Sequence, residues 1–176
     1  MTTRVVYQTC DTPHGPLQVA ATEAGICRVT IPGEPFEAFL AWIERLIPDA
    51  DLAPAEGELD DACAAIAVFF DREPFPPLPL DLRGTPFQCA VWRAVLAIPF
   101  GETRSYADIA RGIGHPLASR AVGAANAVNP LAFIVPCHRV IGADGSIKGY
   151  PGGVIDRKIL LELERGEALT RRPQRR

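Results

Sequence analysis

A cluster of prolines divides this sequence into two halves. The cluster comprises Pro74, Pro76, Pro77 and Pro79. Because proline lacks a backbone N–H and restricts the residue before it, the segment 73–82 is predicted to be an extended connector and not a helix. We therefore expect an N-terminal lobe over 1–82, a C-terminal domain over 83–165, and a flexible basic tail over 166–176. With 176 residues, 48% of them hydrophobic, both parts can share one core.

The first half has the pattern of a small sheet followed by helices. Three short β-prone runs, over 4–9, 17–22 and 26–31, are separated by segments rich in turn-forming residues. This arrangement predicts an antiparallel meander. Apolar residues then recur at helical spacing after Pro35 and again over about 58–70, which predicts two helices. The fold class expected for the whole chain is therefore α+β.

The second half is expected to be mostly helical. Thr85 is predicted to cap its first helix, and Ser105 a second helix over 106–112. A tight turn over 113–115 follows, and a third helix is expected to run from Pro116 to about 127. Two short helices about a glycine-containing turn are typical of a helix-turn-helix.

Charge separates the two halves as well. Residues 1–82 hold four basic and 14 acidic residues, a net charge of -10, whereas 83–176 hold 14 basic and seven acidic residues, a net charge of +7. A polyanion is therefore attracted to the second half and repelled by the first.

Several classes of protein are disfavoured by the sequence. No apolar run approaches the roughly 20 residues that a membrane-spanning helix needs. The first residues lack the apolar stretch of a signal peptide. Five cysteines are an odd number at scattered spacings, which predicts reduced thiols and no disulfide framework. We therefore expect a cytoplasmic protein with no membrane partner.

Cys137 is the strongest candidate for a reactive group. It follows Pro136 at the end of an apolar run and precedes His138 and Arg139. Positive neighbours lower the pKa of a thiol and so raise the fraction of nucleophilic thiolate. A histidine can accept the thiol proton, directly or through water, and a carboxylate can orient that histidine. Glu164, in the last predicted helix, is a candidate for this carboxylate.

The C-terminal half resembles the O6-alkylguanine-DNA alkyltransferases, also called methylated-DNA–protein-cysteine methyltransferases. The resemblance extends from Thr85 to Glu164, about 80 residues, and centres on the Pro-Cys-His-Arg-Val run that contains Cys137. The other matching segments are Thr85–Gln88, Ile98–Thr103, Ser105–Tyr106, Ser119–Gly123, Asn129–Pro130, Gly149–Tyr150 and Leu160–Glu164. The N-terminal half resembles the family only loosely, around residues 12–17.

The resemblance implies a fold and a reaction. The N-terminal lobe would be ribonuclease H-like and the C-terminal domain winged-helix-like. A helix-turn-helix would enter the minor groove of alkylated double-stranded DNA, and the damaged base would be flipped out. The O6-alkyl group of guanine, or the O4-alkyl group of thymine, would then pass irreversibly to Cys137, once per molecule. No cofactor, metal or obligatory protein partner is expected, and the protein would act as a monomer.

The resemblance also assigns roles to individual residues. His138 and Glu164 would relay the proton of Cys137, Asn129 would brace the active-site loop, and Tyr106 would crowd the phosphate and help to rotate the nucleotide. Arg120 would fill the gap left in the base stack. Ser119 and Gly123 belong to the small-residue face of the helix that would approach DNA. The base pocket would be formed by Val135, Gly149, Tyr150 and Pro151.

Two features depart from the family pattern. Pro151 stands where many members have a residue whose backbone N–H can bond guanine O6, and proline has no N–H. Some members bind zinc in the N-terminal lobe, but here only Cys10, His14 and Cys27 are candidates. No fourth ligand has convincing spacing, so we expect these three residues to be structural.

Three other functions are consistent with parts of the pattern. A module that binds alkylated DNA without repairing it would replace the acceptor cysteine, whereas Cys137 is present. A cysteine hydrolase would pair Cys137 with His138, yet adjacent residues usually point their side chains apart. A methyl-responsive transcription factor would need a further DNA-binding domain.

Overall fold

The first lobe is a four-stranded sheet in a computed structural model that describes residues 2–147 and 157–166. Its strands are β1 (Thr3–Cys10), β2 (Leu17–Thr22), β3 (Gly25–Val29) and β4 (Ala50–Pro54), in the order β3-β2-β1-β4. The three predicted strands form the antiparallel meander, but β4 pairs parallel to β1. The prediction of an antiparallel sheet is therefore wrong, and the sheet is mixed. The short run Ala-Asp-Leu-Ala-Pro of β4 has no β-branched residue to mark it as a strand.

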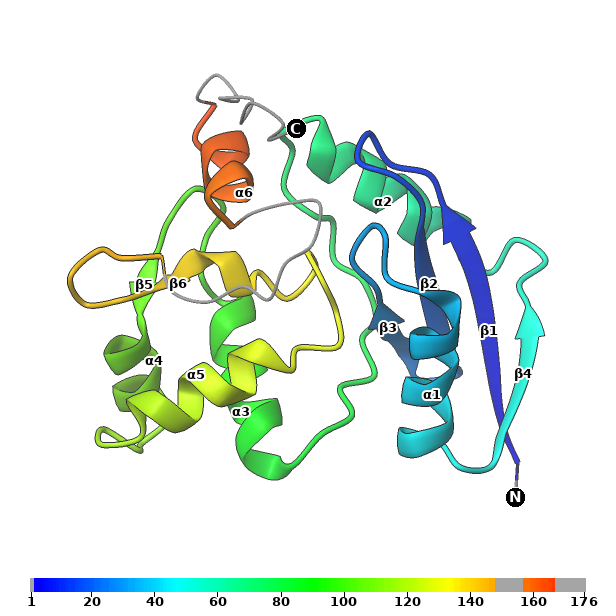
Figure 1. Ribbon diagram of the computed structural model, residues 1–176, viewed down its shortest axis with the longest axis horizontal. Helices are drawn as coiled ribbons and strands as arrows, with labels where there is room; N and C mark the ends of the chain where they lie inside the picture. The colour runs from blue at the N-terminus through cyan, green and yellow to red at the C-terminus, as the bar shows by residue number, and fades with distance from the viewer. Residues whose placement is uncertain (1, 148–156, 167–176) are drawn as a thin grey trace, which may run out of the picture.

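Each face of the sheet has its own apolar layer. Val5, Ala20 and Cys27 face α1 (Phe36–Leu46), which covers one side (Figure 1). Strand residues that point to the opposite face of the sheet, such as Val6 and Val19, belong to a core shared with α2 and the second half of the chain. This division follows from the alternation of side chains along a strand.

α2 (Asp60–Phe70) and the helices of the second half lie on the other side of the sheet. An extended connector leads from α2 to α3 (Pro86–Leu96), as the prolines predict. The helices α4 (Tyr106–Gly112), α5 (Ser119–Ala127) and α6 (Arg157–Glu164) complete this half (Figure 1). Within this half, two short strands, β5 (Arg104–Ser105) and β6 (Val140–Ile141), pair in parallel. The structure is thus mixed α/β, with one core running through both halves.

The predicted caps of the helix-turn-helix region are confirmed. Thr85 and Ser105 each form a capping box with the residue three positions later, at the starts of α3 and α4. Gly114, with φ at +78°, ends α4, and His115 N–H donates to Ala110 at 2.9 Å. A left-handed glycine with this hydrogen bond is a common helix end.

The predicted start of the next helix at Pro116 is wrong. Ala118 N–H donates to the carbonyl of His115 at 2.9 Å, so residues 115–118 form a turn, and α5 begins at Ser119. Proline at the second position of a turn satisfies the same φ restraint that favours it in the first turn of a helix. The local sequence therefore does not distinguish a turn that contains Pro116 from a helix that begins at Pro116.

The expectation of reduced thiols is wrong for two of the cysteines. Cys10, at the end of β1, and Cys63, on α2, form a disulfide, with their Cα atoms 5.5 Å apart. The two residues are 53 positions apart in sequence, and only the packing of α2 against the sheet brings them together. Of the other metal candidates, His14 packs its ring against Phe70, and Cys27 Sγ donates to the carbonyl of Ala20.

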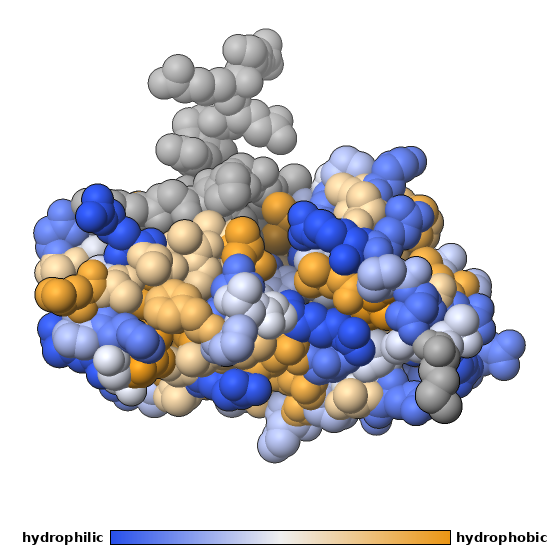
Figure 2. Space-filling model, turned by 90° about the horizontal axis from the view of Figure 1, so that it is seen from below, coloured by the Kyte–Doolittle hydropathy of each residue, from blue (hydrophilic) through white to orange (hydrophobic). Residues whose placement is uncertain are grey.

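The surface seen from below mixes hydrophobic and hydrophilic residues. Orange and blue patches alternate across both lobes on this face (Figure 2). Over residues 2–147 and 157–166, no helix combines the length and the apolar character needed to cross a membrane.

Candidate active site

Cys137 is the first residue of a 3₁₀ turn, Cys137–Arg139, and its backbone carbonyl is hydrogen-bonded to a side chain near the end of α5. Its N–H donates to the carbonyl of Val135 at 2.7 Å, and only 4% of the residue is exposed. The preceding segment contains Phe133 with φ at +67°, an uncommon conformation for an aromatic residue. Strain of this kind persists where surrounding contacts hold the chain, and Phe133 packs against Phe69 and Phe70 of α2.

Glu164 on α6 is the centre of a buried ionic network. Its Oε1 accepts from His138 Nε2 at 2.5 Å, and its two oxygens accept from Arg139 Nε at 3.1 and 2.9 Å. Burial acts to raise the pKa of Glu164, but hydrogen bonds from His138 and Arg139 and the charge of Arg139 outweigh it and hold the pKa at about 2. The predicted contact between Glu164 and His138 is therefore present, and the carboxylate is ionised.

The network determines which nitrogen of His138 can act as a base. A carboxylate only accepts hydrogen bonds, so Nε2 carries the hydrogen. Burial lowers the pKa of His138, and although Glu164 opposes this effect, the ring is neutral. Nδ1 then has a lone pair, and it is buried without a hydrogen-bond partner among the described residues. This atom can accept a proton from a nearby thiol, directly or through water.

The thiol of Cys137 is not activated in the way that its sequence neighbours indicate. Burial raises the pKa of Cys137, while the charge of Arg157 and a hydrogen bond with Asn129 partly lower it. The side chains of His138 and Arg139 are directed to Glu164 instead. Arg157 is thus a functional residue that sequence reasoning missed, because no local pattern marks a basic residue on a distant helix as a neighbour of the thiol.

Asn129 connects the end of α5 to the segment that precedes Cys137. Its Nδ2 donates to the carbonyl of Val135 at 2.9 Å, and its Oδ1 accepts from Leu131 N–H at 3.0 Å. Val135, one of the residues expected in the base pocket, is fully buried. The two hydrogen bonds of Asn129 therefore link the end of α5 to the segment that leads to Cys137.

The sheet of the first half holds the same segment from the other side. Val29 N–H of β3 donates to Pro130 at 2.8 Å, and Ala132 N–H donates back to Val29 at 3.2 Å. Arg28 adds a bond from Nη1 to Pro130 at 3.3 Å, forms an ion pair with Glu34, and lies over the ring of Trp42. The first half of the chain therefore positions the active-site segment directly.

The residues expected to contact DNA gather on one side of α4 and α5. A Cβ at Gly123 would lie 3.7 Å from the ring of Tyr106, so α5 passes close to this side chain. Tyr106 Oη accepts from Arg157 Nη1 at 3.0 Å, which ties it to the cation beside Cys137. Arg120 is exposed and Ser119 half-buried at the start of α5. The remaining expected pocket residues, 149–151, lie outside the described residues.

Two exposed hydrophobic side chains flank α5. Leu117, in the turn before the helix, is 100% exposed, and Val128, after its end, is 56% exposed.

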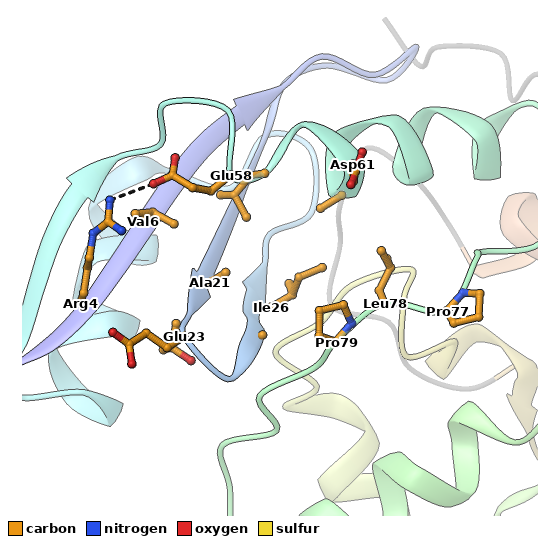
Figure 3. A pocket seen from close by; sticks show the side chains of 14 residues that line it. Arg4, Val6, Ala21, Glu23, Ile26, Glu58, Asp61, Pro77, Leu78 and Pro79 are labelled. Carbon is orange, nitrogen blue, oxygen red and sulfur yellow. Dashed lines mark hydrogen bonds and ion pairs between the residues drawn. The ribbon is translucent and has the colours of Figure 1, made fainter.

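Cys137 lines one of two separate cavities. One, of about 260 Å³, is lined by Cys137, Asn126, Asn129 and Ala132 together with residues of the first half, among them Arg28. Another, of about 420 Å³, lies between the sheet and the connector, where Ile26 and Leu78 form its walls and the Arg4–Glu58 ion pair its rim (Figure 3). The second cavity shares no lining residue with the first.

Comparison with known proteins identifies the family. Residues 86–166 match the model of the 6-O-methylguanine DNA methyltransferase, DNA binding domain. The methylated-DNA–protein-cysteine methyltransferase of Mycobacterium tuberculosis is 45% identical over 165 residues, covering 92% of this chain and 93% of that protein. The chain belongs to this family. The inducible methyltransferase of Bacillus subtilis is 40% identical and covers 84% of this chain.

Solved structures of the methyltransferase family support the fold. The crystal structure of Mycobacterium tuberculosis OGT in complex with DNA aligns with a TM-score of 0.77 at 42% identity, covering 92% of this chain and 93% of that one. The chain is thus an enzyme of the methylated-DNA–protein-cysteine methyltransferase class, and its mixed α/β fold is that of these proteins.

Proposed function

We propose that this protein repairs DNA by transferring the O6-alkyl group of guanine to Cys137. The observation that carries the proposal is a thiol that lines a cavity and is followed, in the same 3₁₀ turn, by the histidine of the buried His138–Glu164 pair. The family membership supports the same reaction. O4-alkylthymine is proposed as a second substrate.

The chemistry follows from the protonation states of the site. The proton of Cys137 passes to Nδ1 of His138, and Glu164 stabilises the resulting imidazolium. The thiolate sulfur then attacks the alkyl carbon, the bond from that carbon to O6 breaks, and its electron pair remains on the base, which takes up a proton. A thioether is stable under these conditions, so each molecule acts once.

The damaged base has to leave the duplex to reach the thiol. We propose that α5 enters the minor groove, where the small residues at Gly123 and nearby positions permit a close approach, and that the base is flipped into a pocket completed by Gly149, Tyr150 and Pro151. Extrusion costs a few kcal/mol of unstacking. Insertion of Arg120 and contacts of Ser119 and Tyr106 with the backbone offset part of this cost.

We propose that the protein acts as a monomer on double-stranded DNA in the cytoplasm. The division at residue 82 would separate a supporting lobe from the domain that binds DNA. The charge of the second half favours this orientation on a polyanion.

Adduct mapping tests the proposal. One equivalent of duplex containing O6-methylguanine is expected to add one methyl group to Cys137, detected by mass spectrometry of the digested protein. Cys137→Ser is expected to abolish transfer and retain DNA affinity, and Arg120→Ala to slow transfer from duplex. A folded sample that acquires no methyl group under excess substrate would refute the proposal.

A further inference from the structure

The Cys10–Cys63 disulfide closes the first half of the chain covalently. Cys10 is the last residue of β1 and Cys63 lies in the first turns of α2, so the bond encloses β2, β3, α1 and β4. A reducing cytoplasm keeps most thiols reduced, and the disulfides of cytoplasmic proteins are usually transient or redox-sensing. The proposed cytoplasmic location therefore makes this bond a candidate for redox control.

The end of α2 that carries Cys63 borders a cavity. Leu59 and Ala62 line the space of about 420 Å³ between the sheet and the connector (Figure 3). Side chains that border a cavity make fewer van der Waals contacts than fully packed ones. The nearby ion pair between Arg4 and Glu58 is exposed, so it contributes little stability. The disulfide therefore holds an end of the helix that packing alone holds loosely.

The other end of α2 packs against the active site. The ring centre of Phe69 lies 5.9 Å from that of Phe133 and 6.0 Å from that of His138. Phe70 also contacts Phe133, at 5.4 Å between ring centres. Rigid helices carry coupling between distant sites when both ends are packed against responsive groups. A change at the disulfide end of α2 therefore reaches the histidine and the segment that leads to Cys137.

We propose that Cys10 and Cys63 form a reversible redox site that controls how firmly α2 supports His138 and Phe133. The reacting partner is a low-molecular-weight disulfide of the glutathione type. With the bond closed, the protein is more stable and transfers the alkyl group faster, because the ring of His138 is held in place. With two free thiols, α2 is held less firmly and transfer is slower.

Oxidation proceeds by two thiol–disulfide exchanges. Cys63 is half-buried, whereas Cys10 is only 4% exposed, so the small disulfide reaches Cys63 first. The Cys63 thiolate attacks one sulfur of that disulfide and releases one small thiol, which leaves a mixed disulfide. The Cys10 thiolate then attacks the Cys63 sulfur, forms the S–S bond of the structure and releases a second small thiol. The two protein thiols are thereby oxidised, the small disulfide is reduced, and the two protons end on the released thiols.

Glutathione buffers of graded oxidised-to-reduced ratio test the site. Free thiols are trapped with iodoacetamide after denaturation and counted by mass spectrometry of the digested protein. We expect Cys10 and Cys63 to lose their free thiols together as the ratio rises, while Cys27 keeps its thiol. The oxidised form is expected to melt about 10 °C higher, because the bond restricts the unfolded chain over a separation of 53 residues.

Alkyl transfer is measured on the same samples with duplex containing O6-methylguanine. The oxidised form is expected to transfer about threefold faster than the reduced form. Oxidation of Cys137 itself would have the opposite sign, because a blocked acceptor cannot react. Cys63→Ser cannot form the bond and is expected to behave as the reduced form in every buffer. Cys27→Ala is the matched control and is expected to retain the full response.

The pH–rate profile separates support of the histidine from stability alone. Burial lowers the pKa of His138. Of the charged groups that face it, Glu164 raises this pKa, and Arg139 and Arg157 lower it. Looser packing of Phe69 admits water to the ring, so in the reduced form the pKa of His138 moves up towards its ordinary value. The acid limb of the profile is then expected at higher pH, because a protonated His138 cannot accept the thiol proton.

Three results would overturn the inference. A bond that stays closed in fully reduced glutathione would be a permanent structural link. Two thiols that stay free in fully oxidised glutathione would mean that there is no redox site. Equal rates and equal pH profiles for the two forms would show that the bond does not reach His138. A wild type that transfers no methyl group in either form would instead refute the proposed function, while the thiol counts and the melting temperatures still test the bond.

Discussion

The molecule contains two deeply buried thiols in very different surroundings. Cys27 lies in the sheet against α1, and burial together with the charge of Asp81 raises its pKa to about 12. Cys137 is equally buried, and its pKa is also raised, but Arg157 and Asn129 oppose the effect. Cys137 lines a cavity of about 260 Å³, whereas Cys27 is packed among apolar side chains.

The comparison shows that burial by itself does not make a cysteine reactive. Burial removes both sulfur atoms from water, which disfavours the charged thiolate in each case. Cations lower the pKa of both thiols, but only Cys137 also has a neutral histidine within the same 3₁₀ turn and a cavity that a ligand can enter. The predictions below remove these differences one at a time.

The largest effect is expected from removing the carboxylate of Glu164. Glu164→Gln leaves Arg139 without its buried counter-charge and His138 Nε2 without its carboxylate acceptor, so we expect the free energy of unfolding to fall by about 3–5 kcal/mol and alkyl transfer to be strongly slowed. Urea denaturation measures the first effect. Glu102→Gln, which breaks the exposed pair with Arg104, is the matched control and should cost less than about 1 kcal/mol. Equal losses in the two variants would contradict the proposed role of the network.

The same carboxylate predicts how stability depends on acid. The pKa of Glu164 is depressed from 4.5 to about 2 in the folded protein. A depressed pKa contributes stability above the unfolded value that is lost as pH falls through the folded value, here from 4.5 towards about 2. This loss amounts to about 3 kcal/mol. Denaturation followed between these pH values should show the loss in the wild type and not in Glu164→Gln.

A further effect is expected from removing Arg157, whose charge opposes the effect of burial on the pKa of Cys137. In Arg157→Met the thiolate loses its stabilising charge, so the pKa of Cys137 rises further, and a rise of one unit makes transfer at neutral pH about tenfold slower. The pH–rate profile should shift to more alkaline pH. Lys158→Met, a change of the exposed neighbour on α6, should leave the profile in place. An unshifted profile in Arg157→Met would show that another group activates the thiol.

The smallest effect is expected at the other thiol. Cys27→Ala removes a sulfur that does not line the cavity, so the transfer rate should not change and stability should fall by about 1 kcal/mol. Quenched time courses of alkyl transfer measure the rate, and thermal melting measures the stability. Slower transfer in a fully folded Cys27→Ala protein would mean that the two regions are coupled through the sheet.

Local patterns in the sequence predicted the elements whose cause is local. The capping boxes at Thr85 and Ser105 are confirmed because a cap depends on residues three positions apart. The connector is extended because prolines exclude a helix. β4 was missed because its pairing with β1 is decided by the neighbouring strand and not by its own composition.

The sequence pointed to the site residues whose chemistry is recognisable without distances. Residue types made Cys137 a candidate nucleophile, with His138 as its base and Glu164 as a possible orienting carboxylate, and the resemblance to the family gave Cys137 the role of acceptor. The sequence could not reveal the Cys10–Cys63 bond, the cation at Arg157 or the hydrogen bond from Asn126 Nδ2 to the carbonyl of Cys137. These depend on distances between segments remote along the chain. Packing of α2 on the sheet, and of α6 against the helix-turn-helix, decided them, because charge, burial and hydrogen bonding act through space.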